Sequence, residues 1–194
     1  MESSDLKRFI NIPTLYWRGI KLRRILKTDI DDVYEYASDP VTSEYLLWSP
    51  HPTKAFTKKY LDHLDKKYRR AEFYDWGIEF EGKMIGTCGF TCFSIENNSA
   101  EIGYVLNKRY WGRGIAKEAA RMVMDFGFAE LSLNRIEARY MVENDASRIV
   151  MEKCFMKPDG VLRSSIYCKK RYRDVGVYSI LADEYFEYKT KGLI

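Results

Sequence analysis

Two periods of apolar residues run along the chain, and the change from one to the other predicts where strands give way to helices. Alternation of apolar and polar residues, or a short apolar run between turn residues, indicates a strand. Such segments occupy residues 19–25, 74–80, 84–93, 100–106, 135–142, 161–168 and 175–181. Recurrence every three or four positions predicts helices that begin near Thr28, Thr53, Gly114 and Ala146.

The clearest helix follows Gly114. Its apolar side is carried over several turns by Ala116, Ala119, Ala120, Val123, Met124, Gly127 and Phe128. Along the chain, the predicted elements follow the order strand, two helices, three strands, helix, strand, helix and two strands. This order predicts an α/β (α+β) fold, with one mixed sheet and helices on both faces. A length of 194 residues fits a single domain, which we assign to residues 12–194, after a frayed polar segment at 1–11.

Charge and metal-binding residues narrow the function classes. The net charge of +4 is a mild excess that permits anionic ligands without requiring nucleic acid. Basic runs at 66–70 and 169–173 are typical of solvated faces, and RNA binding stays an alternative that predicts tight, salt-sensitive binding. The four cysteines form no CxxC pair and there are only two histidines, so we predict no metal site.

Targeting signals are not evident. The N-terminus lacks the basic and apolar segments of a signal peptide, and no apolar run approaches the roughly 20 residues of a membrane span. Scattered unpaired cysteines fit a reducing compartment. We therefore expect a cytoplasmic protein with no membrane partner. The sequence does not fix the oligomeric state and is compatible with a homodimer.

The segment between the strand at 100–106 and the clearest helix carries the strongest chemical signal. Gly112 and Gly114 let the backbone turn tightly and approach a ligand closely. The free N–H groups of the first helical turn and the helix dipole favour an anion there. Four cations and no acid occur in this stretch, namely Lys108, Arg109, Arg113 and Lys117. The loop therefore predicts a pyrophosphate site.

Two other interpretations of this loop stay open. A short glycine loop is often only a turn. A dinucleotide-binding fold also uses GxGxxG after a strand, with an acid such as Glu137 about 20 residues later. The third glycine is absent, however, and the strand at 100–106 is half polar, unlike a buried parallel strand. A P-loop is excluded because GxxxxGK[ST] does not occur.

The stretches AEIGYVLNKRYWGRGIAKEA and LNRIEARYMVENDASRIVMEKCFMKPDG, and with them residues 19–185, resemble one known superfamily. They are similar to the GNAT superfamily of acetyl-CoA-dependent N-acetyltransferases, and most of all to the Rim-type branch that acetylates the N-termini of ribosomal proteins. The resemblance implies a splayed mixed sheet of six or seven strands. It also implies acetyl-CoA as co-substrate, with its pantetheine arm in the cleft between strands 100–106 and 135–142.

The resemblance also implies roles for individual residues. Cofactor contacts are expected from Val105, Leu106, Gly112, Arg113, Gly114, Ile115, Ala116, Lys117 and Asn144. Ser147 lies where a hydroxyl can reach the thiol sulfur, and Glu101 lies where related enzymes place a carboxylate that takes a proton through water. We expect direct transfer in a ternary complex, with the Val105 N–H polarising the thioester carbonyl. Cys88, Cys92 and Cys154 remain less favoured candidates for an acetylated nucleophile.

Three positions depart from the family pattern. Trp111 stands where many members have Gln or Arg, although the Rim-type branch often has an aromatic residue there. Met151 replaces a tyrosine that protonates the leaving thiolate, so this role passes to Ser147 or to water. Cys154-Phe155 replaces a Gly-Phe pair behind the sulfur.

The acceptor is expected to be a primary amine, most of all the α-amine of a protein N-terminus. Such an amine, with a pKa near 7.7–8.0, is about one-third neutral at pH 7.5, whereas a lysine is only about 0.1% neutral. The acceptor side is predicted to include Trp48, His51 and Tyr74, with Trp76 favoured as a core residue. The alternatives are a polyamine or antibiotic acetyltransferase, and a binding module that holds acetyl-CoA without catalysis.

Overall fold

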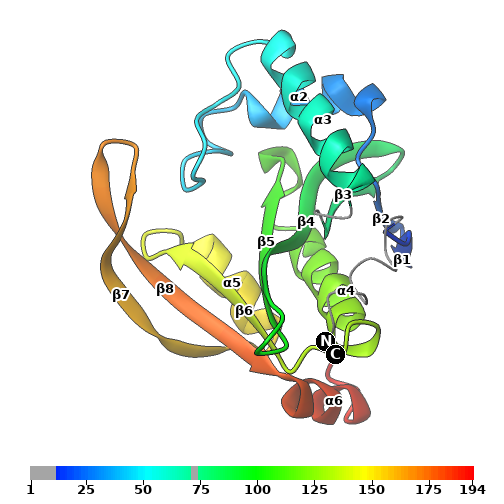
Figure 1. The fold of residues 1–194 in the computed structure, drawn as a ribbon, viewed down its shortest axis with the longest axis vertical. Helices are drawn as coiled ribbons and strands as arrows, with labels where there is room; N and C mark the ends of the chain where they lie inside the picture. The colour runs from blue at the N-terminus through cyan, green and yellow to red at the C-terminus, as the bar shows by residue number, and fades with distance from the viewer. Residues whose placement is uncertain (1–11, 71–73) are drawn as a thin grey trace.

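Residues 12–70 and 74–194 are described by the computed structural model of the protein, without the side chain of Tyr74. The expected N-terminal segment 1–11 lies outside this part. The described residues form an eight-stranded sheet in the order β1-β2-β3-β4-β5-β6-β8-β7 (Figure 1). The strands are β1 (Leu15–Trp17), β2 (Ile20–Arg23), β3 (Tyr74–Phe80), β4 (Lys83–Ser94), β5 (Ser99–Leu106), β6 (Arg135–Met141), β7 (Lys157–Cys168) and β8 (Arg171–Leu181).

Helices cover both faces of the sheet, as the order of elements predicts. They are α2 (Ile30–Ala37), α3 (Lys54–Arg69), α4 (Ile115–Ala129), α5 (Asp145–Lys153) and α6 (Ala182–Thr190). On one face, the Trp76 ring of β3 lies 5.4 Å from the Phe126 ring of α4, and both side chains are buried. Neighbouring strand residues point to opposite faces, so Asp75 points away from α4. On that second face, the α3 residue Tyr68 donates a hydrogen bond to the Asp75 carbonyl, 2.5 Å away.

The clearest predicted helix is confirmed. Its buried residues repeat the predicted apolar face, with Ala119, Ala120, Val123 and Met124 at its centre. Thr53 caps α3, because its side-chain oxygen accepts the Phe56 N–H at 3.2 Å. Two short elements, β1 and α6, were not expected, and β7 begins at Lys157 where the sequence predicted a strand only from residue 161.

β5 and β6 are the parallel pair in a sheet whose other pairs are antiparallel. Their register runs from Ser99 opposite Arg135 to Ile102 opposite Ala138. Both strands continue beyond this point without pairing to each other, so they splay apart from Gly103 onward. This is the opening that the family resemblance implies.

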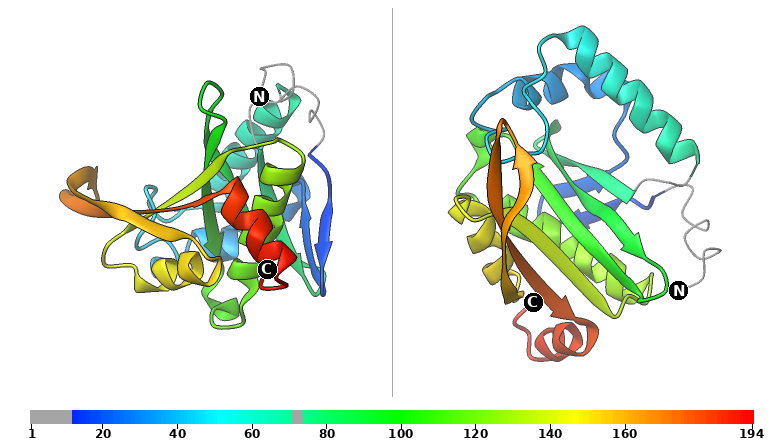
Figure 2. Two further views of the ribbon diagram at one scale, coloured as in Figure 1. Left: turned by 90° about the horizontal axis from the view of Figure 1, so that it is seen from below. Right: turned by 60° about the vertical axis from the view of Figure 1, so that its left-hand side comes forward.

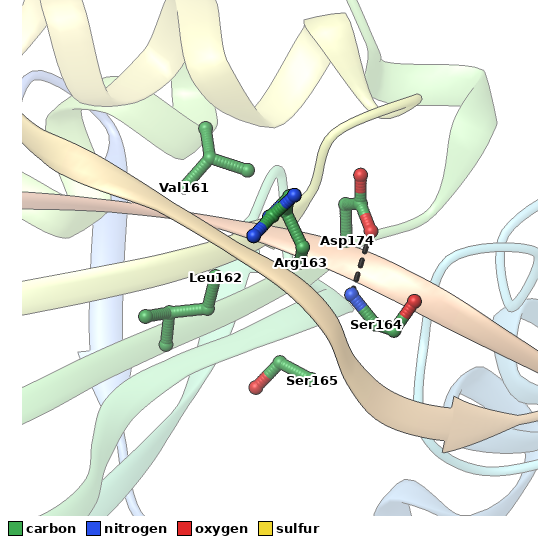
Figure 3. A pocket seen from close by; sticks show the side chains of 6 residues that line it. All are labelled: Val161, Leu162, Arg163, Ser164, Ser165 and Asp174. Carbon is green, nitrogen blue, oxygen red and sulfur yellow. Dashed lines mark hydrogen bonds between the residues drawn. The ribbon is translucent and has the colours of Figure 1, made fainter.

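β7 and β8 form a long hairpin that extends away from the central strands (Figures 1 and 2). Its tip contacts the segment between α2 and α3. There, the Lys169 ammonium donates to the carbonyls of Ser43 and Glu44, and Cys168 Sγ lies 3.6 Å from the Leu46 carbonyl oxygen. A shallow pocket on the hairpin is lined by residues 161–165 and Asp174, whose carboxylate accepts the Ser164 N–H at 2.7 Å (Figure 3). This pocket contains none of the predicted site residues.

Candidate active site

A single cavity of about 1420 Å³ connects the start of α4 with the space under the α2–α3 segment. It passes the point where β5 and β6 separate. Most of the predicted site residues line it, namely Trp48, His51, Glu101, Val105, Leu106, Gly112, Gly114, Ile115, Ala116, Lys117, Asn144 and Ser147. Arg113 is not among the lining residues. Tyr74 begins β3 opposite Phe90, but its side chain lies outside the described part of the chain.

The loop before α4 has the conformation that its glycines allow. Gly112 and Gly114 have φ values of 75° and 76°, and a Cβ atom on either would meet no heavy atom within 4 Å. The first bond of the helix runs from the Glu118 N–H to the Gly114 carbonyl, so the amides of residues 115–117 have no acceptor within the helix. Open space in front of free amides and a positive helix end suits a diphosphate.

The basic residues of this loop divide into two groups. Lys108 pairs with Asp39 at 2.9 Å, and Arg109 pairs with Glu35 at 3.2 Å, so both hold the loop against α2 and its C-terminal end. The hydrogen bond from Lys108 lowers the pKa of Asp39 to about 2. Two of the four cations in this stretch are therefore engaged with acidic side chains of the protein itself. Lys117 lines the cavity and also contacts Glu118 at 2.6 Å, while Arg113 lies over the Tyr110 ring at 5.2 Å.

Trp111 has a clear structural role at its unusual position. Its indole N–H donates to the Leu106 carbonyl at 2.7 Å, and about half of its surface is exposed. This bond ties the loop to the end of β5. The Leu106 oxygen is thereby engaged already, although a carbonyl can accept a second hydrogen bond.

β4 and β5 approach closely beside the opening. A Cβ atom on Gly86 would lie 2.2 Å from the Val105 carbonyl oxygen and 3.0 Å from the Leu106 Cα. Glycine is therefore required at this position for the two strands to pair. The Val105 carbonyl lies against β4, on the side of β5 away from β6.

Ser147 has a partner that the sequence analysis missed. The Tyr104 hydroxyl lies 3.0 Å from Ser147 Oγ and donates to the Ser147 carbonyl oxygen at 3.0 Å. Burial raises the pKa of Tyr104, so its phenol keeps its proton at neutral pH. Asn144 caps α5 by accepting the Ser147 N–H at 3.2 Å, and it also lines the cavity. No spacing in the sequence brings Tyr104 together with a residue 43 positions later.

Glu101 is held in place by two neighbours. Thr91 Oγ1 donates to its carboxylate at 3.1 Å, and Arg139 Nε lies 3.2 Å away. Arg139 also contacts Glu137, which stands directly opposite Glu101 in the β5–β6 register. The carboxylate reaches the cavity, but as one member of an ion-paired group.

The cysteines differ in their environments. Cys88 and Cys154 are buried, and burial raises the pKa of both thiols, that of Cys154 to about 12. A thiol that resists ionisation is a poor nucleophile. Cys154 Sγ lies 3.6 Å from the Lys117 carbonyl oxygen, so it packs against the first turn of α4. Phe155, the second residue of the pair that replaces Gly-Phe, has a left-handed backbone with φ 61°.

Aromatic rings line the acceptor side. His51 is only 7% exposed, and its ring centroid lies 5.5 Å from Trp48, 4.9 Å from Phe56 and 5.5 Å from Tyr60. Its Nδ1 lies 3.0 Å from Thr57 Oγ1, and burial lowers the pKa of the imidazole. Trp76 is fully buried and donates to the Pro13 carbonyl at 2.8 Å, which confirms it as a core residue.

Among residues 12–70 and 74–194, no group of three or more His, Cys, Asp or Glu side chains is arranged to hold a metal ion. No helix within these ranges combines the length and apolar character needed to cross a bilayer.

Comparison with known proteins identifies the family to which this fold belongs. The family model described as acetyltransferase (GNAT) domain matches residues 20–157. The chain is 33% identical to an uncharacterized N-acetyltransferase of Bacillus licheniformis, over 89% of this chain and 98% of that protein. It is 28% identical to a putative ribosomal N-acetyltransferase of Bacillus subtilis, over 73% and 79% of the two chains. It is 25% identical to the spermidine N(1)-acetyltransferase of Escherichia coli, over 90% and 92%.

Solved structures of acetyltransferases have the same fold. A GNAT-family acetyltransferase from Bacillus anthracis superposes with a TM-score of 0.79 at 28% identity, covering 89% of this chain and all of the other. A ribosomal L7/L12 alpha-N-protein acetyltransferase in complex with coenzyme A has a TM-score of 0.77 over 89% and 99% of the chains; at 20% identity it shows the fold alone. The fold and site define an N-acetyltransferase of the class that uses acetyl-CoA as co-substrate. The chain belongs to the GNAT acetyltransferase family.

Proposed function

We propose that this enzyme transfers the acetyl group of acetyl-CoA directly to the α-amine of a peptide or protein N-terminus, in a ternary complex. The observation that carries the proposal is the continuous cavity, which joins the free amides at the start of α4 to an aromatic acceptor side through the opening between β5 and β6. Likeness to a putative ribosomal N-acetyltransferase supports the choice of acceptor.

The cofactor side would be formed by the loop before α4. The amides of Gly114, Ile115, Ala116 and Lys117 would bind the diphosphate, and Gly112 would allow its approach. Val105 and Leu106 at the end of β5, and the side chain of Asn144, would line the pantetheine arm along the opening. Arg113 would contribute from the rim.

The chemical step would then proceed with defined proton transfers. The neutral amine attacks the thioester carbon, and a β5 backbone N–H that faces away from β4, such as that of Leu106, stabilises the oxyanion that develops. As the C–N bond forms and the C–S bond breaks, the nitrogen loses a proton and the sulfur gains one. Glu101 would take the proton through water, and the Ser147–Tyr104 hydroxyl pair would return one to the thiolate. An α-amine is already partly neutral near pH 7.5 and needs little help from a base, so this arrangement suits it better than a lysine.

A thiol-release assay with acetyl-CoA tests the proposal. We expect coenzyme A release with peptides that have free N-termini, and none with the same peptides blocked at the α-amine. Release with no amine at all, despite binding of acetyl-CoA, would support a binding module instead. A trapped acetyl-cysteine would contradict direct transfer. Failure to bind coenzyme A in calorimetry would overturn the whole assignment.

A further inference from the structure

Asp75 is an acidic side chain in the acceptor part of the cavity that the proposed mechanism does not use. It is the second residue of β3 and points to the face covered by α2 and α3, opposite to α4. Its side chain lines the same cavity as His51 and Tyr60. Burial first, and the nearby Asp75 charge second, raise the pKa of Tyr60, which indicates that the two groups are close.

The Asp75 carboxylate has no cationic partner in the described part of the chain. Glu101 and Glu35, which also lie near the site, are each paired with a basic side chain. Around Asp75, burial raises the pKa of the carboxyl to about 7, although hydrogen bonds from Thr87 and the Trp76 N–H oppose this shift. Even a half-buried carboxylate such as this one is costly unless it is compensated. A ligand with a positive charge would supply that compensation.

The position of Asp75 relative to the reaction site follows from the strand register. Asp75 pairs with Gly89 on β4, and Gly89 pairs with Gly103 on β5. Gly103 is the first residue of β5 beyond its pairing with β6. Adjacent strands lie about 4.8 Å apart, so the Asp75 backbone lies about 10 Å from the start of the opening.

We propose that Asp75 binds a second, positively charged nitrogen of the acceptor while the reacting amine lies at the opening between β5 and β6. The site would thus select an acceptor that carries an alkylammonium group about 10 Å or less from its reacting amine. The rings of Tyr36, Tyr60 and His51 line the same space. The faces of the two tyrosine rings can attract a cation that has left bulk water. This inference rests on the proposed acetyl transfer to an amine and defines its substrate class.

Two sources could supply this group, a diamine or polyamine and the side chain of a lysine that follows the N-terminal residue of a peptide. We would compare kcat/KM for putrescine against n-butylamine, and for an Ala-Lys peptide against an Ala-norleucine peptide. Each pair differs mainly in the second charge. We expect the charged member to be favoured about ten- to hundredfold in at least one pair, as is typical of a charged hydrogen bond. The favoured pair identifies the source.

The variant Asp75→Asn should abolish this preference and leave the KM for acetyl-CoA unchanged. Glu44→Gln is the matched control, because Glu44 also lines the cavity but is exposed at its rim. The control should keep the preference. If no amine is acetylated, the proposed function is wrong. If amines are acetylated without a preference for the charged member, or if the preference survives in Asp75→Asn, the role of Asp75 is wrong.

Putrescine binding to the wild-type protein, measured by calorimetry with coenzyme A present, gives a second test that needs no variant. Affinity should rise between pH 6.5 and 8, as the Asp75 carboxyl ionises near pH 7. Lys67 of α3 is a charged residue that lines the same cavity. The shifts at the other groups near Asp75 lead away from this window. Burial lowers the pKa of His51, and burial raises the pKa values of Tyr36, Tyr60, Tyr68 and Cys88. An affinity that does not change with pH would contradict the inference.

Discussion

At the scale of single residues, Asp75 should lower stability in the absence of acceptor. Its carboxyl has a pKa of about 7 in the folded protein, against about 3.9 in an unfolded chain. The folded state therefore holds a proton that the unfolded state has lost, and stability falls as pH rises from about 4 to 7. Asp75→Asn should remove this cost, with a gain on the order of 1–2 kcal/mol at pH 8 and little change at pH 4.5.

Thermal unfolding at the two pH values measures the effect, since 1 kcal/mol corresponds to roughly 2–4 °C for a chain of this size. Glu44→Gln removes an exposed carboxylate and should leave both melting temperatures unchanged. A lower melting temperature for Asp75→Asn at pH 8 would mean that the carboxylate has a favourable partner in the folded protein.

Glu101 allows a second residue-scale prediction, on rate rather than stability. Glu101→Gln should lower kcat for an N-terminal amine by about tenfold to hundredfold near pH 7, because it removes the base. The deficit should shrink by pH 9, where the α-amine is already neutral. Glu137→Gln is the control, since Glu137 shares Arg139 but is not placed as the base. A pH-independent deficit in Glu101→Gln would indicate a structural role.

At the scale of elements, the pairing of β4 with β5 depends on Gly86. Gly86→Ala places a Cβ atom against the Val105 carbonyl, which belongs to the backbone and cannot rotate away. We expect a loss of about 1–3 kcal/mol in urea unfolding, together with weaker binding of coenzyme A because the edge of the opening moves. Gly112→Ala is a useful contrast, since the space there is open but φ is positive. It should weaken coenzyme A binding with less effect on stability.

The sequence predicts elements well where the signal is local. The apolar face of α4 and the start of α3 near Thr53 are both set within a few turns of helix, and both are confirmed. β1 has only three residues, and α6 buries little besides Tyr185, so neither leaves a clear period in the sequence. The site is less predictable. The pairing of Lys108 and Arg109 with acids of α2 and its C-terminal end joins residues about 70 positions apart, which no local pattern reveals.

At the scale of the whole molecule, the acceptor side is assembled from segments far apart in the chain. The α2–α3 segment supplies Trp48 and His51, β8 supplies Val175, and β3 supplies Asp75. The splayed strands β5 and β6 alone would leave the acceptor side of the cavity open to solvent. Contact between the tip of the β7–β8 hairpin and the α2–α3 segment joins these walls, and the Lys169 ammonium is central to that contact.

Lys169→Ala should therefore affect the acceptor and the cofactor differently. Loss of the ammonium frees the carbonyls of Ser43 and Glu44, so the α2–α3 segment is held less firmly to the hairpin and the aromatic wall shifts. We expect KM for the amine to rise several-fold, while KM for acetyl-CoA is unchanged, because Lys108 and Arg109 anchor the loop before α4 to α2 and its C-terminal end rather than to the hairpin. Lys170→Ala removes a neighbouring exposed charge and should change neither value. Equal changes in both KM values would show that the hairpin and the cofactor loop act as one unit.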